Sequence, residues 1–427
     1  MENLLIMRQN SVLNSIDLVL ILLYFSIIIF GCLAIYSSEI DENTFQSISF
    51  FSRPGKHLFF LFIISILIIF IQLFDYRFII NISFPIYLLS IFLLLLVLIY
   101  GTTISGSTSW ISIYDFRFQP SEFAKFTTAL FLANYLENKK NAKKNLKIKL
   151  ISLTIIFLPF VLILSQGDFG TAFIFFSFIV VLYRYNIIPI KFILILISFA
   201  LLFFHGIILD KITLFGVIII FTLFAIGIFI NNLKRVFQIS VFCILSLIIV
   251  QGQNFILENV LEPRHKNRII SLFNPNSDPL GSGWNVSQSK IAIGSGGLFG
   301  NGYLQGTQTR FDFVPEQSTD FIFSVIGEEF GFIGSLLFII LYSFFLFRLL
   351  NLAEIQKDKF SLIYGYSVFS LFFFHYSLNI AMSMGLFPVI GIPLPLVSYG
   401  GSSIISFSIL FFVFIKLNSY QPSILRR

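Results

Sequence analysis

Residues 17–37 read DLVLILLYFSIIIFGCLAIYS, an almost unbroken run of apolar side chains. A bilayer core of about 30 Å requires roughly 20 apolar residues in a helix, so this stretch is long enough to span a membrane. Similar runs recur along the 427 residues, of which 57% are hydrophobic and 11% charged. Because an ordinary soluble domain carries about 25% charged residues, the composition excludes a water-soluble fold and predicts an all-α polytopic membrane protein.

Apolar runs of spanning or nearly spanning length occur about twelve times. They cover residues 17–37, 57–74, 78–100, 120–137, 149–165, 170–184, 190–208, 213–231, 236–252, 320–349, 361–384 and 400–418. The runs at 149–165 and 170–184 are short and close together, which favours tilted or partly buried helices. The first run has no small-residue cleavage site, so we expect an uncleaved first helix.

The basic residues define one orientation. Six lysines crowd the loop between the fourth and fifth runs, namely Lys139, Lys140, Lys143, Lys144, Lys147 and Lys149. The positive-inside rule places this loop in the cytoplasm. Alternation of the spans then places both termini and the other basic loops in the cytoplasm. The net charge of +7 therefore indicates membrane topology rather than nucleic-acid binding.

Three outer segments keep polar residues, and residues 101–125 are the first of them. Pro120 followed by Ser121 and Glu122 predicts a helix start. Glu122 and Lys125 are three residues apart and share a helix face. Two interpretations remain open: a local ion pair in a capped helix, or a charged pair at the outer mouth of a cavity, with Lys125 free to bind an anionic substrate.

The second outer segment, residues 165–171, is a tight turn with Asp168 at its apex. An aspartate in a turn commonly accepts hydrogen bonds from nearby backbone amides. A turn-stabilising Asp168 and a catalytic Asp168 are both consistent with this pattern.

The third outer segment, residues 252–320, is too long for a plain connection. Structureless loops beyond about 15 residues are usually functional or disordered. Its large aromatic side chains argue against disorder; they are Trp284, Phe299, Tyr303, Phe311 and Phe313. We therefore expect a folded, glycine-punctuated outer domain over the membrane mouth.

Two familiar kinds of site lack support in the sequence. The glycines of residues 294–302 do not match G-x-G-x-x-G, and G-x-x-x-x-G-K-[ST] is absent, so no nucleotide cofactor is expected. The four histidines fall on different predicted elements without metal-ligand spacing, which disfavours zinc. A divalent cation, Mg²⁺ or Mn²⁺, stays open as a cofactor, because Mg²⁺ needs only one or two carboxylates beside a phosphorylated substrate.

Taken together, these segments resemble the SEDS (shape, elongation, division, sporulation) family of peptidoglycan glycosyltransferases, and within it the RodA branch. The matching segments follow in order over nearly the whole chain: residues 119–125, 166–172, 278–289, 293–323 and 391–403. Residues 306–308 and 313–320 favour the RodA branch over its septal paralogue FtsW. The chain departs from the family at Ser109, where an Arg is common, and at Gly167, which replaces a Pro.

The resemblance also implies the domain organisation. It predicts a single SEDS-type membrane domain over residues 1–427, with about two spans in 185–250 beyond the family core of ten helices. The large extracytoplasmic loop, 252–320, would carry the catalytic residue. Residues 391–403 are expected to form a re-entering outer turn that walls a substrate groove. The protein is expected in the bacterial cytoplasmic membrane, with its active site on the outer face.

The resemblance implies lipid II, a disaccharide-pentapeptide on undecaprenyl pyrophosphate, as the substrate. The GlcNAc 4-hydroxyl would displace pyrophosphate from C1 of the donor MurNAc with inversion, which by analogy with inverting glycosidases needs a carboxylate base. Asp278 matches the family's essential aspartate and is predicted to be that base. An Asp-Pro turn residue is the alternative from the sequence alone.

The departing pyrophosphate needs fixed positive charge. Lys125, supported by Glu122, is the first candidate, Arg268 the second, and a divalent cation the third. A solvated loop charge is the alternative interpretation of Arg268. The other predicted substrate-binding residues are Gln288, Ser289 and Asp168. The candidate metal ligands are Asp320, Glu328 and Glu329, although helix capping also explains Thr319-Asp320.

Two other functions compete with this one. A lipid flippase or transporter would place ionisable groups near the midplane of several helices, whereas here they cluster at the outer mouth. An FtsW-type septal polymerase would perform the same chemistry with other partners. The resemblance implies a class B penicillin-binding transpeptidase, elongation-machinery membrane proteins and membrane lipid as partners, and no nucleic acid is expected.

Overall fold

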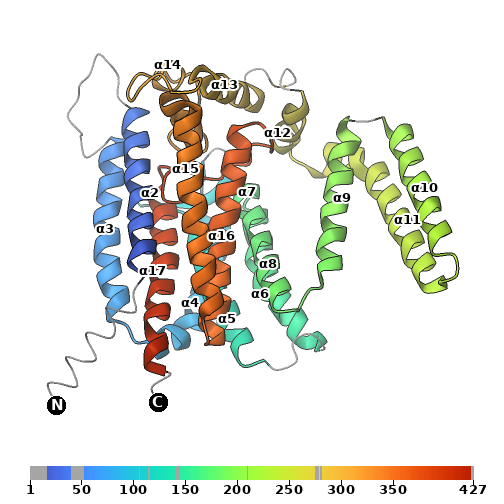
Figure 1. Cartoon of the computed structure of the whole chain (residues 1–427), viewed down its shortest axis with the longest axis horizontal. Coiled ribbons are helices and arrows are strands. Elements are labelled where there is room, and N and C mark those ends of the chain that lie inside the picture. The colour runs from blue at the N-terminus through green and yellow to red at the C-terminus, as the bar shows by residue number, and fades with distance from the viewer. Residues whose placement is uncertain are drawn as a thin grey trace. The chain divides into compact units, whose positions relative to one another are not determined.

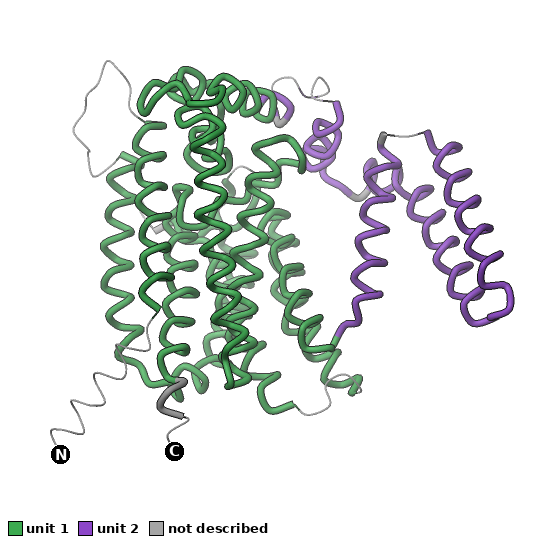
Figure 2. Tube along the Cα trace, in the orientation of Figure 1, with its two compact units in different colours: residues 1–187, 285–427 green, residues 188–284 purple. Residues whose placement is uncertain are grey.

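The computed structural model describes residues 17–39, 52–104, 106–113, 116–139, 145–208, 210–274, 278 and 281–424, which are mostly helical (Figure 1). The predicted all-α class is confirmed. The chain divides into two compact units (Figure 2), unit 1 with residues 1–187 and 285–427 and unit 2 with residues 188–284.

Unit 1 contains most of the long helices. Its first part consists of α2 (Leu18–Ser37), α3 (Arg53–Leu73), α4 (Tyr76–Tyr100), α5 (Pro120–Glu137), α6 (Leu146–Ser165), α7 (Phe169–Ile174), the 3₁₀ turn η1 (Phe175–Ser177) and α8 (Phe178–Arg184). Its second part consists of α13 (Ser282–Ser295), which begins at the end of unit 2, α14 (Thr307–Arg310), α15 (Ile322–Ile355), α16 (Lys359–Ser383) and α17 (Gly401–Ile424). The short helices of residues 169–184 agree with the predicted short span at 170–184.

Nine helices in the described ranges are long and apolar enough to span a bilayer, and together they establish a multi-pass membrane protein. They are α2, α3, α4, α6, α9, α10, α11, α15 and α17. Residues 169–184 form a shorter apolar helical stretch. The helices α5 and α16 are not among the nine, although both fall on predicted spans. The predicted number of about twelve spans therefore stays a prediction.

Helix α5 lies inside unit 1, where it packs against α4, α6, α16 and α17. Most of its side chains are buried, including the charged Glu122 and Lys125. By contrast, many large apolar side chains of α3 and α4 are exposed, as expected of helices that face lipid. An inner helix shielded from lipid can keep polar groups, because neighbouring helices rather than hydrocarbon surround them.

A small antiparallel sheet precedes α5 and was not predicted. Its strands β1 (Thr102–Ile104), β2 (Ser107–Ile113) and β3 (Phe116–Phe118) pair in chain order. The amide of Thr108 in β2 donates to the carbonyl of Gln166 at 2.9 Å, which ties the sheet to the turn before α7. Ser109, the residue where the family commonly has Arg, is fully buried in β2.

Unit 2 consists of α9 (Ile190–Ile208), α10 (Lys211–Ile228), α11 (Leu233–Phe255), the π-helical turn η2 (Ile256–Val260) and α12 (Pro263–Phe273). Helices α10 and α11 pack through a small core of Leu214, Ile218 and Val250. Helices α9 to α11 occupy the region where about two extra spans were predicted.

The described part of residues 252–320 is folded into α12, α13, α14 and connecting turns, as the aromatic content predicted. Helix capping, the alternative interpretation of Thr319-Asp320, is not the role that the structure gives Thr319. The residue preceding α15 is Phe321, and the Thr319 hydroxyl instead donates to the carbonyl of Glu316 at 3.2 Å.

Candidate active site

A buried cluster of charged and polar side chains lies at the start of α5. The ammonium of Lys125 is 2.7 Å from Oε1 of Glu122 and 2.9 Å from Nε2 of His375 on α16. Lys125 is 0% exposed, Glu122 3% and His375 1%. Three ionisable side chains are thus held together away from solvent.

The local sequence explains how α5 presents this pair. Helix α5 begins at Pro120, as predicted, and its first turn carries Glu122, where the positive end of the helix dipole favours an acid. The spacing of three residues brings Lys125 onto the same face. From α17, the Ser406 hydroxyl donates to the Glu122 carbonyl at 2.6 Å, and the Phe407 ring lies 5.1 Å from the Lys125 ammonium.

The Lys125 ammonium is enclosed by protein groups, and its predicted binding of an anionic substrate stays a prediction. Such a pair is costly to bury, since two charges leave water for one interaction. Oε2 of Glu122 is also buried, and it has no hydrogen-bond partner among the described residues. This oxygen is therefore a buried acceptor that no described protein donor satisfies.

The sequence analysis does not predict a role for His375 in this cluster. Its Nδ1 lies 3.2 Å from the carbonyl of Pro393. One turn later on α16, the Asn379 side chain donates to the carbonyls of Ile392 and Asp320 at 2.7 and 2.8 Å. Two polar residues at i and i+4 in an apolar helix, followed by a proline-rich segment, are the signal that could have identified His375.

Asp168 belongs to the same electrostatic neighbourhood. Its Oδ1 accepts from the amide of Thr171 at 3.0 Å, so the turn-stabilising interpretation is confirmed. Its Oδ2 accepts from the side-chain amide of Gln119, the residue before α5, at 2.8 Å. Burial raises the pKa of Asp168, and the charge of Glu122 acts in the same direction, whereas the charge of Lys125 lowers it.

Residues 384–400, between α16 and α17, form turns and irregular backbone, which agrees with the predicted non-helical segment. Two glycines allow other helices to approach it closely. A Cβ on Gly170 would lie 2.1 Å from the Ile390 carbonyl oxygen, and one on Gly31 would lie 2.6 Å from Cα of Val397. This segment therefore has closely fitted neighbours from α2 and α7.

Asp278 and Arg268 lie in unit 2. A Cβ on Gly281 would lie 2.4 Å from Oδ2 of Asp278, so the carboxylate folds back over a residue that must lack a side chain. Arg268 is partly exposed on α12. The prediction that Asp278 and Lys125 serve one site stays a prediction, because the two residues belong to different units.

Gln288 and Ser289 lie on α13 and are buried. The Ser289 hydroxyl donates to the carbonyl of Ser383, the last residue of α16, at 2.8 Å. Ser289 therefore contributes to the packing of α13 on α16, and its predicted contact with substrate stays a prediction.

The three candidate metal ligands do not form a metal centre in the described chain. Both oxygens of Glu328 accept hydrogen bonds from α14, including the amides of Thr307 at 2.6 Å and Thr309 at 2.9 Å. Glu329 accepts from the Ser37 hydroxyl and from the amide of Leu304. Within the described ranges, no three His, Cys, Asp or Glu side chains come together as metal ligands. Glu328 thus acts as a cap for α14.

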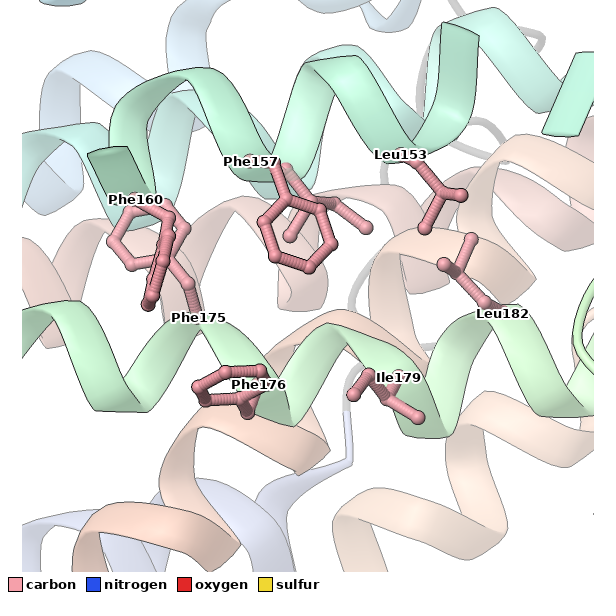
Figure 3. A pocket seen from close by; sticks show the side chains of 8 residues that line it. Leu153, Phe157, Phe160, Phe175, Phe176, Ile179 and Leu182 are labelled. Atoms are coloured by element: carbon pink, nitrogen blue, oxygen red, sulfur yellow. The ribbon is translucent and has the colours of Figure 1, made fainter. Parts of the chain in front are cut away.

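A separate apolar pocket lies between α6 and the η1–α8 stretch (Figure 3). It is lined by Leu153, Ile156, Phe157, Phe160, Phe175, Phe176, Ile179 and Leu182. None of these side chains can transfer a proton or bind phosphate, so this pocket does not supply the chemistry.

The combination of membrane helices, buried Lys125–Glu122 pair and irregular segment before α17 agrees with comparisons to known proteins. The cell cycle protein family of FtsW, RodA and SpoVE matches residues 17–212 and 190–422. The chain belongs to this family, the SEDS family.

Two relatives and one solved structure illustrate the relationship. The peptidoglycan glycosyltransferase RodA of Treponema pallidum (strain Nichols) is 32% identical over 96% of this chain and 98% of its own. The peptidoglycan glycosyltransferase MrdB of Escherichia coli (strain K12) is 33% identical over 75% of this chain and 73% of its own. A structure described as a peptidoglycan synthase complex that coordinates polymerization and crosslinking has a TM-score of 0.68 at 23% identity, covering 95% of this chain and 98% of that chain. This last likeness supports the fold alone.

Proposed function

We propose that this peptidoglycan glycosyltransferase polymerises glycan strands from lipid II on the outer face of the bacterial cytoplasmic membrane. The observation that carries the proposal is the end-to-end similarity to the peptidoglycan glycosyltransferase RodA of Treponema pallidum. The buried Lys125–Glu122 pair supports it, because an ion pair this costly to bury is better explained by chemistry than by stability.

In the proposed reaction, the GlcNAc 4-hydroxyl of lipid II attacks C1 of the donor MurNAc. The bond between C1 and the pyrophosphate oxygen breaks, and the growing chain moves to lipid II with inversion. Asp278 accepts the proton of the attacking hydroxyl. An aspartate carboxylate is a weak base, so the alignment of Asp278 with the hydroxyl must supply much of the effect.

The leaving undecaprenyl pyrophosphate concentrates negative charge, and we assign its stabilisation to Lys125. Glu122 and His375 hold the ammonium in place before substrate arrives. Arg268, Gln288, Ser289 and Asp168 are proposed as further substrate-binding residues. Divalent-cation assistance by Mg²⁺ or Mn²⁺ remains a proposal, but Glu328 does not fit as a ligand, because α14 donors occupy both of its oxygens.

We further propose that the protein serves cell elongation, with a class B transpeptidase and elongation-machinery membrane proteins as partners and both termini in the cytoplasm. The alignment with a RodA over nearly the full length of both chains favours this role over septal synthesis. A septal, FtsW-like role is the second candidate, because the matched family includes FtsW.

The decisive experiment is reconstitution of the purified full-length protein with its cognate transpeptidase on labelled lipid II. Asp278→Ala is expected to abolish glycan polymer while the protein stays folded. Asp210→Ala is the matched control, because Asp210 lies in the same unit and its side chain caps α10 through the amide of Ile212. Polymer formed at the wild-type rate by Asp278→Ala would reject Asp278 as the base.

Reconstitution of the protein into lipid vesicles also tests the flippase alternative. Labelled lipid II placed on one leaflet reports translocation, independently of polymer formation. Translocation by the wild-type protein without any polymer would replace the proposed function with lipid transport.

A further inference from the structure

His375 has two directed contacts that join three parts of unit 1. Nε2 faces the Lys125 ammonium of α5 at 2.9 Å, and Nδ1 faces the Pro393 carbonyl at 3.2 Å. The ring is fully enclosed, with the Phe407 ring edge-on at 4.8 Å between centroids. The imidazole therefore bridges α5 and the irregular segment before α17.

The partners define the protonation state of the bridge. An ammonium is a donor without acceptor capacity, so Nε2 must carry a lone pair toward Lys125. A carbonyl only accepts, so Nδ1 must carry the proton. His375 is thus assigned, from its hydrogen-bond network, as the neutral imidazole protonated on Nδ1.

We propose that His375 is a positioning residue for glycosyl transfer, which fixes the direction of the Lys125 ammonium and links it to the Pro393 carbonyl. The inference rests on the proposed function, in which Lys125 stabilises the leaving pyrophosphate. Glu122 alone restrains the ammonium from its own helix, three residues away. His375 adds the restraint from a second helix, so the ammonium is held between two elements rather than one.

Two conservative variants separate the two contacts. His375→Gln places an amide oxygen near the position of Nε2 and keeps an acceptor for Lys125. His375→Asn places an amide nitrogen near the position of Nδ1 and keeps a donor for Pro393. Loss of packing would affect both variants alike, whereas positioning of Lys125 requires the acceptor that only Gln retains.

The variants are compared in the lipid II polymerisation assay with the transpeptidase present. His375→Gln is expected to stay within about fivefold of wild type, whereas His375→Asn and His375→Phe lose about 10- to 100-fold in kcat, the range for residues that orient a reactive group. KM for lipid II should change much less, because the charge to be stabilised develops on the way to the transition state.

Tyr364→Phe is the matched structural control. Tyr364 is fully buried on the same helix, and its hydroxyl donates to the Leu410 carbonyl of α17 at 3.0 Å. This variant removes a link between α16 and α17 without touching Lys125, so kcat should stay within about twofold of wild type. Equal or greater activity of His375→Asn relative to His375→Gln, or wild-type kcat in His375→Phe, would overturn the proposal.

A measurement on the unaltered protein covers the case in which the variants do not fold. Nitrogen-15 NMR of labelled histidine, on full-length protein in detergent at pH 7, distinguishes the two neutral tautomers from the imidazolium. The expected His375 signals are those of the Nδ1-protonated neutral ring. The other tautomer or an imidazolium would overturn the inference, while a wild-type protein that forms no polymer would instead contradict the proposed function.

Discussion

The ammonium of Lys125 lies 2.7 Å from Oε1 of Glu122, and both side chains are excluded from solvent. Removal of one partner from a buried pair typically costs about 3–5 kcal/mol, because the other charge is left uncompensated. We therefore expect Lys125→Met and Glu122→Gln each to lower the melting temperature strongly, and the double variant to be more stable than the sum of the two losses predicts. Thermal unfolding in detergent measures all three variants.

Among these three variants, the polymerisation activity should not follow the melting temperature. The double variant lacks the ammonium, so it should form no glycan polymer even where it is folded. Polymerisation by a folded protein with Met at position 125 would contradict the assigned role of Lys125.

Gly281 offers a test of Asp278 that leaves the carboxylate itself intact. A Cβ at position 281 would meet Oδ2 of Asp278 at 2.4 Å, so Gly281→Ala should displace the carboxylate. A small misplacement of a catalytic group costs on the order of 100-fold in rate, which is the loss of kcat expected here. Gly252→Ala in the same unit has open space around the added methyl group and should retain kcat.

Substitution of Glu328 tests whether its carboxylate caps α14 or binds a metal ion. Glu328→Gln replaces an acceptor oxygen with an amide donor that faces the donors of α14, and should cost about 1–3 kcal/mol of stability. Because protein groups occupy both oxygens, EDTA should leave the melting temperature of the wild type unchanged. A fall of several degrees with EDTA, restored by Mg²⁺, would show that a cation binds this region after all.

His265 of α12 should make the stability of unit 2 depend on pH. Burial lowers the pKa of His265 to about 4, and the charges of Arg264 and Arg268 add to the effect. The folded state thus favours the neutral ring, and its contribution to stability is complete above the unfolded pKa of about 6.5 and is lost as the pH falls toward 4. At pH 5 the loss amounts to about 2 kcal/mol.

Hydrogen exchange of the α12 amides, corrected for its intrinsic pH dependence, should therefore be less protected at pH 5 than at pH 7. His265→Asn should remove this difference. His205→Asn, which alters an exposed histidine of the same unit, should retain it. Equal protection at both pH values in the wild type would contradict the assignment.

Most of the fold could be predicted from the sequence because each span is a local property. The apolar run beginning at residue 17 predicts α2 within one residue, and Pro120 predicts the start of α5. The three short strands before α5 could not be predicted, since a sheet this small depends on pairing with neighbours rather than on its own apolar pattern.

The candidate site was predictable where its residues are close in sequence. Glu122 and Lys125 share one helix turn, so their contact follows from helix geometry. The contact with His375 joins residues 250 positions apart and depends on how α16 packs against α5. The burial of Lys125 was missed for the same reason, because spacing along one helix does not reveal what covers its face.

The irregular segment before α17 is also made late, because it lies close to the end of the chain. Its neighbours come from α2, α7 and α16, all of which precede residues 384–400 in the chain. The Lys125 ammonium likewise lacks its contact with His375 until α16 is made. A chain truncated before α16 should therefore be inert toward lipid II.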